Sequence, residues 1–221
     1  MDGSRTMSIG ERVYYLVVSV VLAVVTGIMA QASFYLGPVP YTMQNVGIIL
    51  SGLLLPPKYA LFSQSLYILL IAVGLPVAAG FRGGLYVLIG PTGGYIAGFP
   101  IASLLMSVLS RLYLRMRGIR LGDIGFRDAV SLVLLSAVAV LPVYILGFAV
   151  FTWYALSNAN LFNWASKIAS IVGVSGSKIL VLFIATVAVF VPQDILMDHV
   201  IAVIVAKALA RYFEGRGIVF G

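Results

Sequence analysis

Four ionisable residues stand in or beside apolar stretches of the sequence, where a charge is costly to keep. Asp194, Asp198 and His199 occur in an apolar run near the C-terminus, and Arg82 lies in a glycine-rich segment. A charged side chain at membrane depth is expensive, so it usually faces a cavity or a partner group. The chemistry that these residues offer is hydrogen bonding and charge pairing in a binding pocket.

The aspartates near the C-terminus allow more than one interpretation. Asp194 and Asp198 are four residues apart, which places them on one face of a helix and disfavours ionisation of both. A solvated helix start, where carboxylates complement the macrodipole, is the alternative. His199 is turned by about 100° from Asp198, and a lone histidine is more often an interfacial hydrogen-bonding group than a metal ligand. One helix does not readily supply the converging aspartates of a protease, so no metal site and no catalytic residue are expected.

Glycine-rich segments supply a second signal. Residues 80–84 and 90–95 contain Gly-Phe-Arg-Gly-Gly and Gly-Pro-Thr-Gly-Gly-Tyr. Such glycines let the backbone approach a ligand closely, although a re-entrant turn or tight helix packing also explains them. The chain has no Walker A motif, no Ser-His-Asp set and no cysteine. ATP hydrolysis by the chain itself, thiol catalysis and cysteine-based metal centres are therefore excluded.

The elements that must position these residues are membrane helices. Of the 221 residues 62% are hydrophobic and only 10% are charged, and the mean hydropathy is +1.10, which is far too apolar for a soluble core. The apolar residues come in blocks of about 20, the length of a membrane-spanning helix. A formal net charge of +7 does not indicate nucleic-acid binding, because the basic residues lie between the apolar blocks.

The blocks predict a single membrane domain over residues 1–221, an all-α bundle of six transmembrane helices. The expected helices cover residues 13–34, 41–55, 59–74, 92–113, 129–155 and 192–213, with a kink at Pro142 and an apolar lead-in to the last helix over 173–191. Proline pairs end helices, and Pro192 suits the first turn of the last one. The segment from Trp164 to Val191 is the least clear and has room for a re-entrant or interfacial stretch.

The distribution of basic residues predicts the orientation of this bundle. If both termini are cytoplasmic, only Arg82, Lys167 and Lys178 of the 14 lysines and arginines fall on the outer side. The positive-inside rule favours this arrangement and opposes seven spans. Arg82 then lies on the same side of the membrane as the start of the last helix. Topology alone therefore predicts an outward-facing site that contains Arg82 and Asp194.

The first helix carries a ridge of small residues at a spacing of four. The ridge consists of Ser19, Ala23 and Gly27, and Thr26 and Ala30 lie beside it on the helix surface. Small residues let helices approach closely in lipid. Spacing alone is equally consistent with packing inside the bundle and with the surface of a partner subunit.

Several segments together resemble a known family. They are Pro-Val-Pro-Tyr-Thr-Met-Gln at 38–44, Gly-Leu-Leu-Leu at 52–55, Gly-Leu-Pro-Val at 74–77, Gly-Gly-Leu at 83–85 and Gly-Pro-Thr-Gly-Gly-Tyr at 90–95. In this order and spacing the chain resembles the biotin-specific substrate-binding subunit, or S component, of energy-coupling factor (ECF) transporters. The match spans about residues 38–99, with weaker agreement at 190–194.

The resemblance implies a non-enzymatic transport subunit in the cell membrane. Such a subunit captures biotin from outside with high affinity and works with a membrane coupling subunit and two cytoplasmic ATPases; no cofactor is implied beyond biotin as the transported substrate. The small-residue ridge would then face the coupling subunit. An S component for another small vitamin is the main alternative, and a membrane enzyme or a structural subunit is a weaker one.

The resemblance also assigns residues to the site. Asp194 is suited to accept a hydrogen bond from a ureido N–H, and Arg82 can bind the carboxylate or carbonyl of biotin. The remaining expected residues are Thr42, Gln44 and Asn45 as polar groups and Tyr41, Phe81, Tyr86 and Tyr95 as walls, with Gly93 in the glycine motif. The family typically has a lysine three residues after its aspartate, and here that position is Met197. Met197 is therefore a specificity position, and Arg82 or Lys178 is expected to supply the missing charge.

Overall fold

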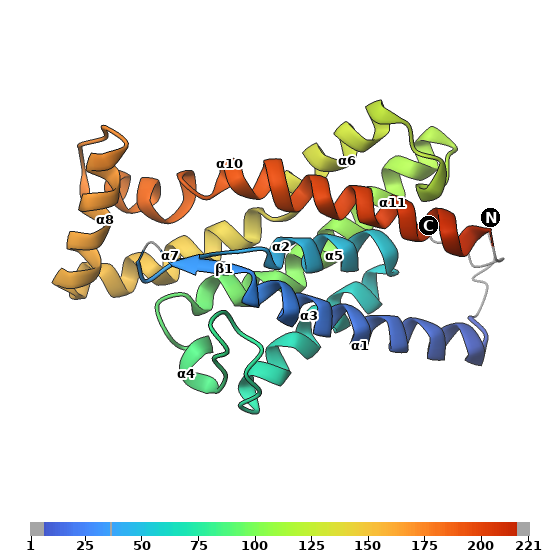
Figure 1. The fold of residues 1–221 in the computed structure, drawn as a ribbon, viewed down its shortest axis with the longest axis horizontal. Helices are drawn as coiled ribbons and strands as arrows, with labels where there is room; N and C mark the ends of the chain where they lie inside the picture. Colours follow the sequence, from blue (N-terminus) through green and yellow to red (C-terminus); the bar gives the residue numbers. More distant parts are fainter. Residues whose placement is uncertain (1–6, 36, 216–221) are drawn as a thin grey trace.

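The computed structural model describes residues 7–35 and 37–215, which form an elongated bundle of helices (Figure 1). The first part of the chain contains α1 (Ile9–Gln31), β1 (Ser33–Tyr35), β2 (Pro40–Thr42), α2 (Gln44–Leu54), α3 (Pro57–Ala72), α4 (Leu85–Leu88) and α5 (Gly93–Arg117). The second part contains η1 (Leu121–Asp123), α6 (Phe126–Ala139), α7 (Leu141–Ser157), α8 (Ala159–Ile171), α9 (Lys178–Phe183), η2 (Ile184–Ala188), α10 (Val191–Gln193), η3 (Asp194–His199) and α11 (Val200–Glu214). Arg5 and Arg216, which enter the predicted charge distribution, lie outside the described residues.

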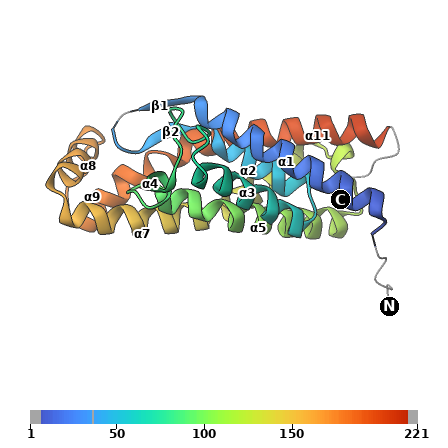
Figure 2. The same cartoon turned by 90° about the horizontal axis from the view of Figure 1, so that it is seen from below.

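The bundle has two different ends. The start of α1, the end of α11 and the start of α6 lie at one end, and the β1–β2 hairpin, α4 and α8 lie at the other (Figures 1 and 2). The two strands pair antiparallel, with Phe34 opposite Tyr41. Helix α8 lies across its end of the bundle (Figure 1). The hairpin, α4 and α8 thus lie at the end for which the sequence predicts the outer side.

Local signals in the sequence account for the helix boundaries. Ser8 and Glu11 form a reciprocal capping box at the start of α1, with Ser8 N–H to Glu11 Oε2 at 2.7 Å, which satisfies free amide groups of the first turn. Pro57 occupies the first turn of α3, where a missing N–H costs nothing. Gly118 ends α5 with a φ of 63°, a left-handed conformation that suits glycine.

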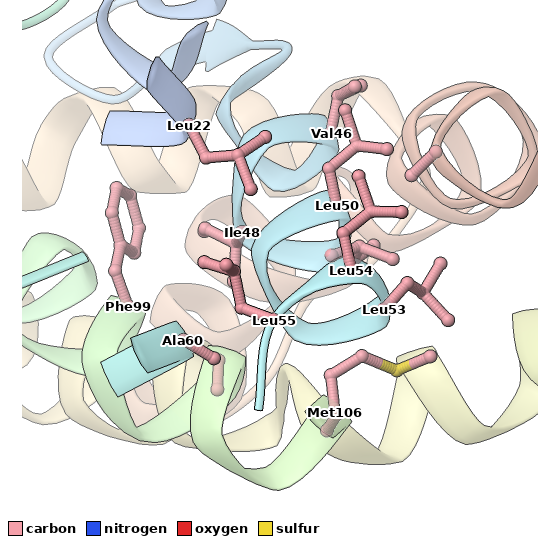
Figure 3. Packing of buried hydrophobic residues seen from close by; sticks show 14 of the residues in the cluster. Leu22, Val46, Ile48, Leu50, Leu53, Leu54, Leu55, Ala60, Phe99 and Met106 are labelled. Atoms are coloured by element: carbon pink, nitrogen blue, oxygen red, sulfur yellow. The ribbon is translucent and has the colours of Figure 1, made fainter. Parts of the chain in front are cut away.

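Helix α2 forms the centre of the bundle. All of its residues are buried, as expected of a helix that is apolar on every side. Its leucines and isoleucines pack against Leu22 of α1, Ala60 of α3 and Met106 of α5 (Figure 3). The first turn of α2 is therefore held by neighbours on several sides, and this turn carries two residues of the predicted site.

Helices α5 and α7 approach each other closely beside α2. A Cβ atom placed on Gly98 of α5 would lie 2.6 Å from the Val143 Cα of α7, a distance at which the backbone would have to shift. Small residues allow such close contacts between helices in lipid. This contact brings the first turns of α7 beside the start of α5.

The predicted start of the last helix is wrong. The helix begins at Lys178 rather than near Pro192 and continues to Glu214, so residues 178–191 are part of it and not a lead-in. Proline normally interrupts a helix because it lacks an N–H and its ring collides with the preceding turn. Here wider π-helical turns, η2 and η3, precede and follow α10, which contains Pro192, and they absorb the irregularity.

Within the described residues four helical segments are long and apolar enough to cross a membrane. They are Ile9–Gln31, Gly93–Arg117, Phe126–Ser157 and Lys178–Glu214. Helices α2 and α3 are shorter, with 11 and 16 residues, below the roughly 20 residues of a typical span. The expected all-helical, multi-pass membrane architecture is confirmed at this level. The predicted segment 129–155 corresponds to α6 and α7, which meet at Val140 just before Pro142.

Candidate binding site

A cavity lies between β2, the start of α2, the 78–92 segment, α5, α7 and the last helix. It contains about 720 Å³ of empty space, counting the part open to solvent. Its lining includes Thr42, Gln44, Asn45, Arg82, Tyr95 and Asp194, which the sequence predicts. The other lining residues are Val39, Pro40, Ala78, Ala79, Val87, Thr92, Ile96, Phe99, Val143, Tyr144 and Phe190.

Asp194 is the acidic residue of the cavity. It belongs to the π-helical turn η3 and is only 6% exposed. Its Oδ2 accepts a hydrogen bond from the Tyr144 hydroxyl of α7, and the Asn45 side chain interacts with the same carboxylate. Because a carboxylate offers about four acceptor positions, these two neighbours orient it and leave capacity for a ligand donor.

A chain of hydrogen bonds fixes the polar groups at the start of α2. Thr42 Oγ1 donates to Gln44 Oε1 at 2.9 Å, and Gln44 Nε2 donates to the Tyr67 hydroxyl at 2.7 Å. Tyr67, which is fully buried, donates in turn to the Val77 carbonyl at 3.0 Å. Both ends of the Gln44 amide therefore have partners, so the amide has one defined orientation in the cavity wall.

Arg82 is the basic residue of the cavity, and it is held by the segment that carries it. Ala78 and Arg82 form a pair of backbone hydrogen bonds, with distances of 2.9 and 3.3 Å. The Arg82 Nε donates to the Ala79 carbonyl at 2.9 Å, and Nη2 donates to the Tyr35 hydroxyl at 3.4 Å. A guanidinium has five N–H donors, so this arrangement orients the side chain without using all of them.

Apolar side chains from three helices form part of the cavity lining. The lining includes Val87 from α4, Ile96 and Phe99 from α5, and Val143 from α7. Phe190 closes the wall beside Asp194, and the Tyr41 ring stacks on it with centroids 4.2 Å apart. The cavity thus combines an acidic group, a basic group and apolar walls, a lining that suits a small ligand with both polar and apolar parts.

Comparison with known proteins identifies the family. The model of the BioY family matches residues 4–215. The chain belongs to the BioY family. A Pyrococcus horikoshii protein described as a probable biotin transporter BioY is 51% identical over 78 residues, 35% of this chain and 48% of that protein. A Rhodobacter capsulatus protein described as biotin transporter BioY is 30% identical over 177 residues, 79% of this chain and 80% of that protein.

A solved structure shares the fold of this BioY chain. It is described as the S-component for biotin from an ECF-type ABC transporter, and it matches with a TM-score of 0.70 over 92% of this chain and 94% of that chain, at 22% identity. The sequence matches are more local. The chain spans about half the length of the first curated relatives, 48% of both the Pyrococcus horikoshii protein and a Thermotoga maritima biotin transporter BioY. The family predicted from sequence motifs is confirmed.

Not all of the predicted site residues of this BioY chain line the cavity. Phe81, in the loop before α4, and Tyr86, in α4, are 72% and 60% exposed and are not among the lining residues. Met197 is 47% exposed on the last helix, and Lys178 lies over the Phe162 ring, 5.5 Å from its centroid. Neither Met197 nor Lys178 is a lining residue, so the prediction that Lys178 replaces the family lysine finds no support in the geometry.

Gly93 and Tyr41 act on the cavity indirectly. A Cβ atom on Gly93 would collide with the Leu88 carbonyl, so this glycine permits the close turn between α4 and α5. Tyr41 donates from its hydroxyl to the Val189 carbonyl at 3.1 Å and stacks behind Phe190. Both residues shape the wall without being part of the lining.

The small-residue ridge does not form a docking surface. Ser19, Ala23, Thr26, Gly27 and Ala30 are all buried within this chain. The Ser19 hydroxyl donates to the Tyr59 carbonyl of α3 at 3.2 Å, and Gln64 Nε2 donates to Thr26 Oγ1 at 3.1 Å. The expectation that the ridge faces a partner subunit is therefore wrong, because α2 and α3 already occupy this face.

Tyr144 is the main residue that the sequence did not reveal. It lies in α7, near Pro142, and reaches Asp194 of the last helix. A tyrosine in an apolar helix carries no local signal of such a contact, since interfacial anchoring is its ordinary role. Thr92, another lining residue, belongs to the glycine motif at 90–95, so the sequence could have indicated it as a site residue.

Proposed function

We propose that this chain is the high-affinity biotin-binding S component of an ECF-type vitamin transporter, and that it captures biotin on the outer side of the cell membrane. Its membership of the BioY family supports the proposal, since the relatives are described as biotin transporters. The observation that carries it is the cavity itself, with Asp194 and Arg82 joined by apolar walls. The function is transport and not catalysis.

The chemistry of biotin matches this lining. Its ureido ring has two N–H donors and a carbonyl, its thioether ring is apolar, and its valerate ends in a carboxylate. Asp194 accepts from a ureido N–H, and Asn45 and Gln44 lie at the same side as further polar groups. Arg82 pairs with the carboxylate through donors that its loop contacts leave unused. The apolar middle of the cavity takes the thioether ring and the valerate chain.

We also propose six membrane spans with both termini in the cytoplasm. The two shorter helices, α2 and α3, cross together with the four long segments, and α2 lies wholly inside the bundle. The distribution of lysine and arginine supports this orientation. The start of α1 and the end of α11 lie at the same end (Figure 1), as an even number of spans requires. The cavity is then reached from the side that carries β1, β2 and α4.

Uptake requires partners in this proposal. The sequence has no Walker A motif, so ATP hydrolysis belongs to two cytoplasmic ATPase subunits and a membrane coupling subunit links them to this chain. Because the small-residue ridge of α1 is buried, the coupling subunit docks on another face.

Equilibrium binding of labelled biotin to the purified protein tests the proposal. The protein in detergent or nanodiscs should bind biotin at a 1:1 ratio, with affinity in the nanomolar range typical of specific high-affinity capture, about −12 kcal/mol. Unlabelled biotin should compete fully, whereas unrelated vitamins should not. A monodisperse protein that shows no saturable biotin binding would overturn the assignment.

One observation favours a different vitamin as the substrate. The family's lysine is replaced by Met197, which is 47% exposed and is not a lining residue of the cavity. A ligand that binds without a lysine in addition to Arg82 would then be favoured. The same competition experiment decides this alternative, because stronger competition by another vitamin than by biotin would select it.

A further inference from the structure

Gln31, the last residue of α1, binds the 78–82 loop through both ends of its side-chain amide. Its Nε2 donates to the Ala78 carbonyl at 3.1 Å, and its Oε1 accepts from the Phe81 backbone N–H at 2.9 Å. Nε2 also donates to the Gly27 carbonyl, one turn earlier in α1, at 3.0 Å. The helix therefore fixes the direction of an amide that contacts one short loop at two points.

The loop that Gln31 contacts carries the basic residue of the cavity. Ala78 and Arg82 close the loop with their pair of backbone hydrogen bonds, and both residues line the cavity together with Ala79. The two contacts of Gln31 lie at the first residue of this closed loop and at the residue before Arg82. A shift of the loop relative to α1 would therefore move the Arg82 backbone relative to the cavity.

The backbone conformation of Phe81 shows why the loop needs a contact from outside. Its φ is 55°, and Phe81 is the one non-glycine residue with a positive φ in the part of the chain that the structure describes. This left-handed conformation is unfavourable for a bulky residue and persists where surrounding contacts enforce it. The Phe81 side chain is 72% exposed, so its packing does little to enforce it. The hydrogen bond from the Phe81 N–H to Gln31 is a contact that does.

We propose that Gln31 is a positioning residue, which fixes the 78–82 loop to the end of α1 and so holds Arg82 where it pairs with the carboxylate of the ligand. The proposal rests on the proposed biotin site for its effect on affinity. Gln31 is not a lining residue of the cavity, and its effect passes through the backbone of the loop. A ligand that ends in a carboxylate therefore depends on Gln31 more than a neutral ligand does.

Removal of the Gln31 amide tests the proposal. Methionine has a similar length and a similar helix propensity but no amide group. Gln31→Met should reduce the preference for biotin over biotin amide by about two- to tenfold, the value of one hydrogen bond, because a displaced Arg82 loses the carboxylate. Loss of contacts with Ala78 and Ala79 affects both ligands and leaves the preference unchanged. In an Arg82→Ala protein the same substitution should cause no further change in the preference.

The matched control removes a glutamine amide that does not touch the loop. Gln64 of α3 is fully buried, and its Nε2 donates to Thr26 Oγ1 at 3.1 Å and to Ser51 Oγ at 2.8 Å. Gln64→Met leaves these buried hydroxyl groups without a partner, so it should lower the recovery of folded protein. It should not change the preference of the folded protein for biotin over biotin amide.

A second substitution in the loop should rescue the first. Asparagine adopts the left-handed conformation more readily than phenylalanine. Phe81→Asn should therefore restore part of the preference for biotin that Gln31→Met removes. Absence of any recovery would overturn the role of Gln31 in stabilising this conformation.

Hydrogen exchange gives a readout that does not depend on biotin. In the ligand-free protein Gln31→Met should speed exchange of the Phe81 amide by about two- to tenfold, while Gln64→Met should not. Equal exchange in the two variants, or equal losses of affinity for the acid and the amide in Gln31→Met, would overturn the positioning role. If the unsubstituted protein binds no biotin, the proposed function fails, and the exchange comparison still decides whether Gln31 holds the loop.

Discussion

Asp194 and Tyr144 meet across 50 positions of sequence in the polar part of the cavity. The Tyr144 hydroxyl orients the carboxylate that, in the proposed function, accepts from the N–H donors of the ligand. A carboxylate accepts hydrogen bonds only, which makes it selective for a donor-bearing group such as a ureido ring. The strength of binding at this point therefore depends on the charge of Asp194 and on the orientation that Tyr144 gives it.

Replacement of Asp194 by asparagine should sharply weaken biotin binding. The amide presents unwanted donors and loses a charge-assisted hydrogen bond, which is worth roughly 1.5–3 kcal/mol, or about 10- to 150-fold in affinity. Titration of purified Asp194→Asn with labelled biotin measures the loss. Unchanged affinity in a monodisperse variant would remove Asp194 from the site.

A second variant separates charge from orientation. Tyr144→Phe keeps the carboxylate and removes only the hydroxyl that donates to it. It should weaken binding less than Asp194→Asn, by about the value of one hydrogen bond, roughly 1 kcal/mol. Equal losses for both variants would mean that orientation, and not charge, determines the binding energy.

Arg82 should distinguish biotin, which ends in a carboxylate, from biotin amide, which does not. Arg82→Ala should cost about tenfold more affinity for biotin than for a biotin amide, because only the acid forms a charge-assisted pair. Any damage to the 78–82 loop affects both ligands, so the amide serves as the internal control. Arg82→Lys should restore only part of the affinity. Equal losses for acid and amide would place Arg82 elsewhere in the site.

At the scale of elements, close packing of α1 explains the small residues that the sequence marks. A Cβ atom placed on Gly47 of α2 would lie 2.8 Å from the Thr26 Cα of α1, so the two backbones are nearly in contact. Spacing in the sequence shows that a helix has a small-residue face but not which helix covers it. The covering helices, α2 and α3, belong to the same chain.

The packing of α1 predicts the effect of a bulky substitution. Ala23→Trp should reduce folded protein and biotin binding together, because Ala23 is 0% exposed and overpacking typically costs 1–3 kcal/mol or more. Val24→Trp is the matched control, since Val24 is the next residue and is 47% exposed; it should be tolerated. For each variant, recovery from size-exclusion chromatography measures the amount of folded protein, and biotin bound per folded protein measures the binding. Full binding by a well-folded Ala23→Trp protein would contradict the packing described here.

The last helix shows what local sequence signals cannot give. Pro192 is typical of a helix start, and the sequence prediction used it in this way. The helix instead continues through it from Lys178, because π-helical turns are formed by packing and leave no periodic signal in the sequence. Asp194 lies in one of these turns, which is consistent with the frequent occurrence of π-bulges at functional sites.

At the scale of the whole molecule, the apolar blocks and the basic residues predicted more than the individual side chains did. The blocks gave a helical membrane protein, and topology placed Arg82 and Asp194 on one side, where the cavity contains both. Contacts such as Tyr144 with Asp194 depend on how α7 packs against the last helix, which no single segment encodes. The exposed residues Phe81 and Tyr86 were expected as aromatic walls of the site, and the type of a residue does not show whether its side chain is buried.

The proposed orientation of the molecule predicts which surfaces are reached from each side of the membrane. The chain has no cysteine, so a single introduced cysteine can be labelled without background. Asn160→Cys in α8 should react with a membrane-impermeant maleimide on intact cells, because α8 lies at the end that carries the cavity (Figure 1). Met116→Cys, at the end of α5 and 78% exposed, should react only after permeabilisation.

The outcome depends on the number of spans between the two labelled positions. In the six-span arrangement one crossing, formed by α6 and α7, separates Met116 from Asn160. The basic residues from Arg111 to Arg127 favour a cytoplasmic location for Met116. Labelling of both cysteines from the same side would show that no crossing separates them. Labelling of Met116→Cys alone on intact cells would show that the protein has the opposite orientation. Inversion would place the cavity on the cytoplasmic side and exclude capture of biotin from outside, whereas loss of the crossing would contradict the six-span arrangement.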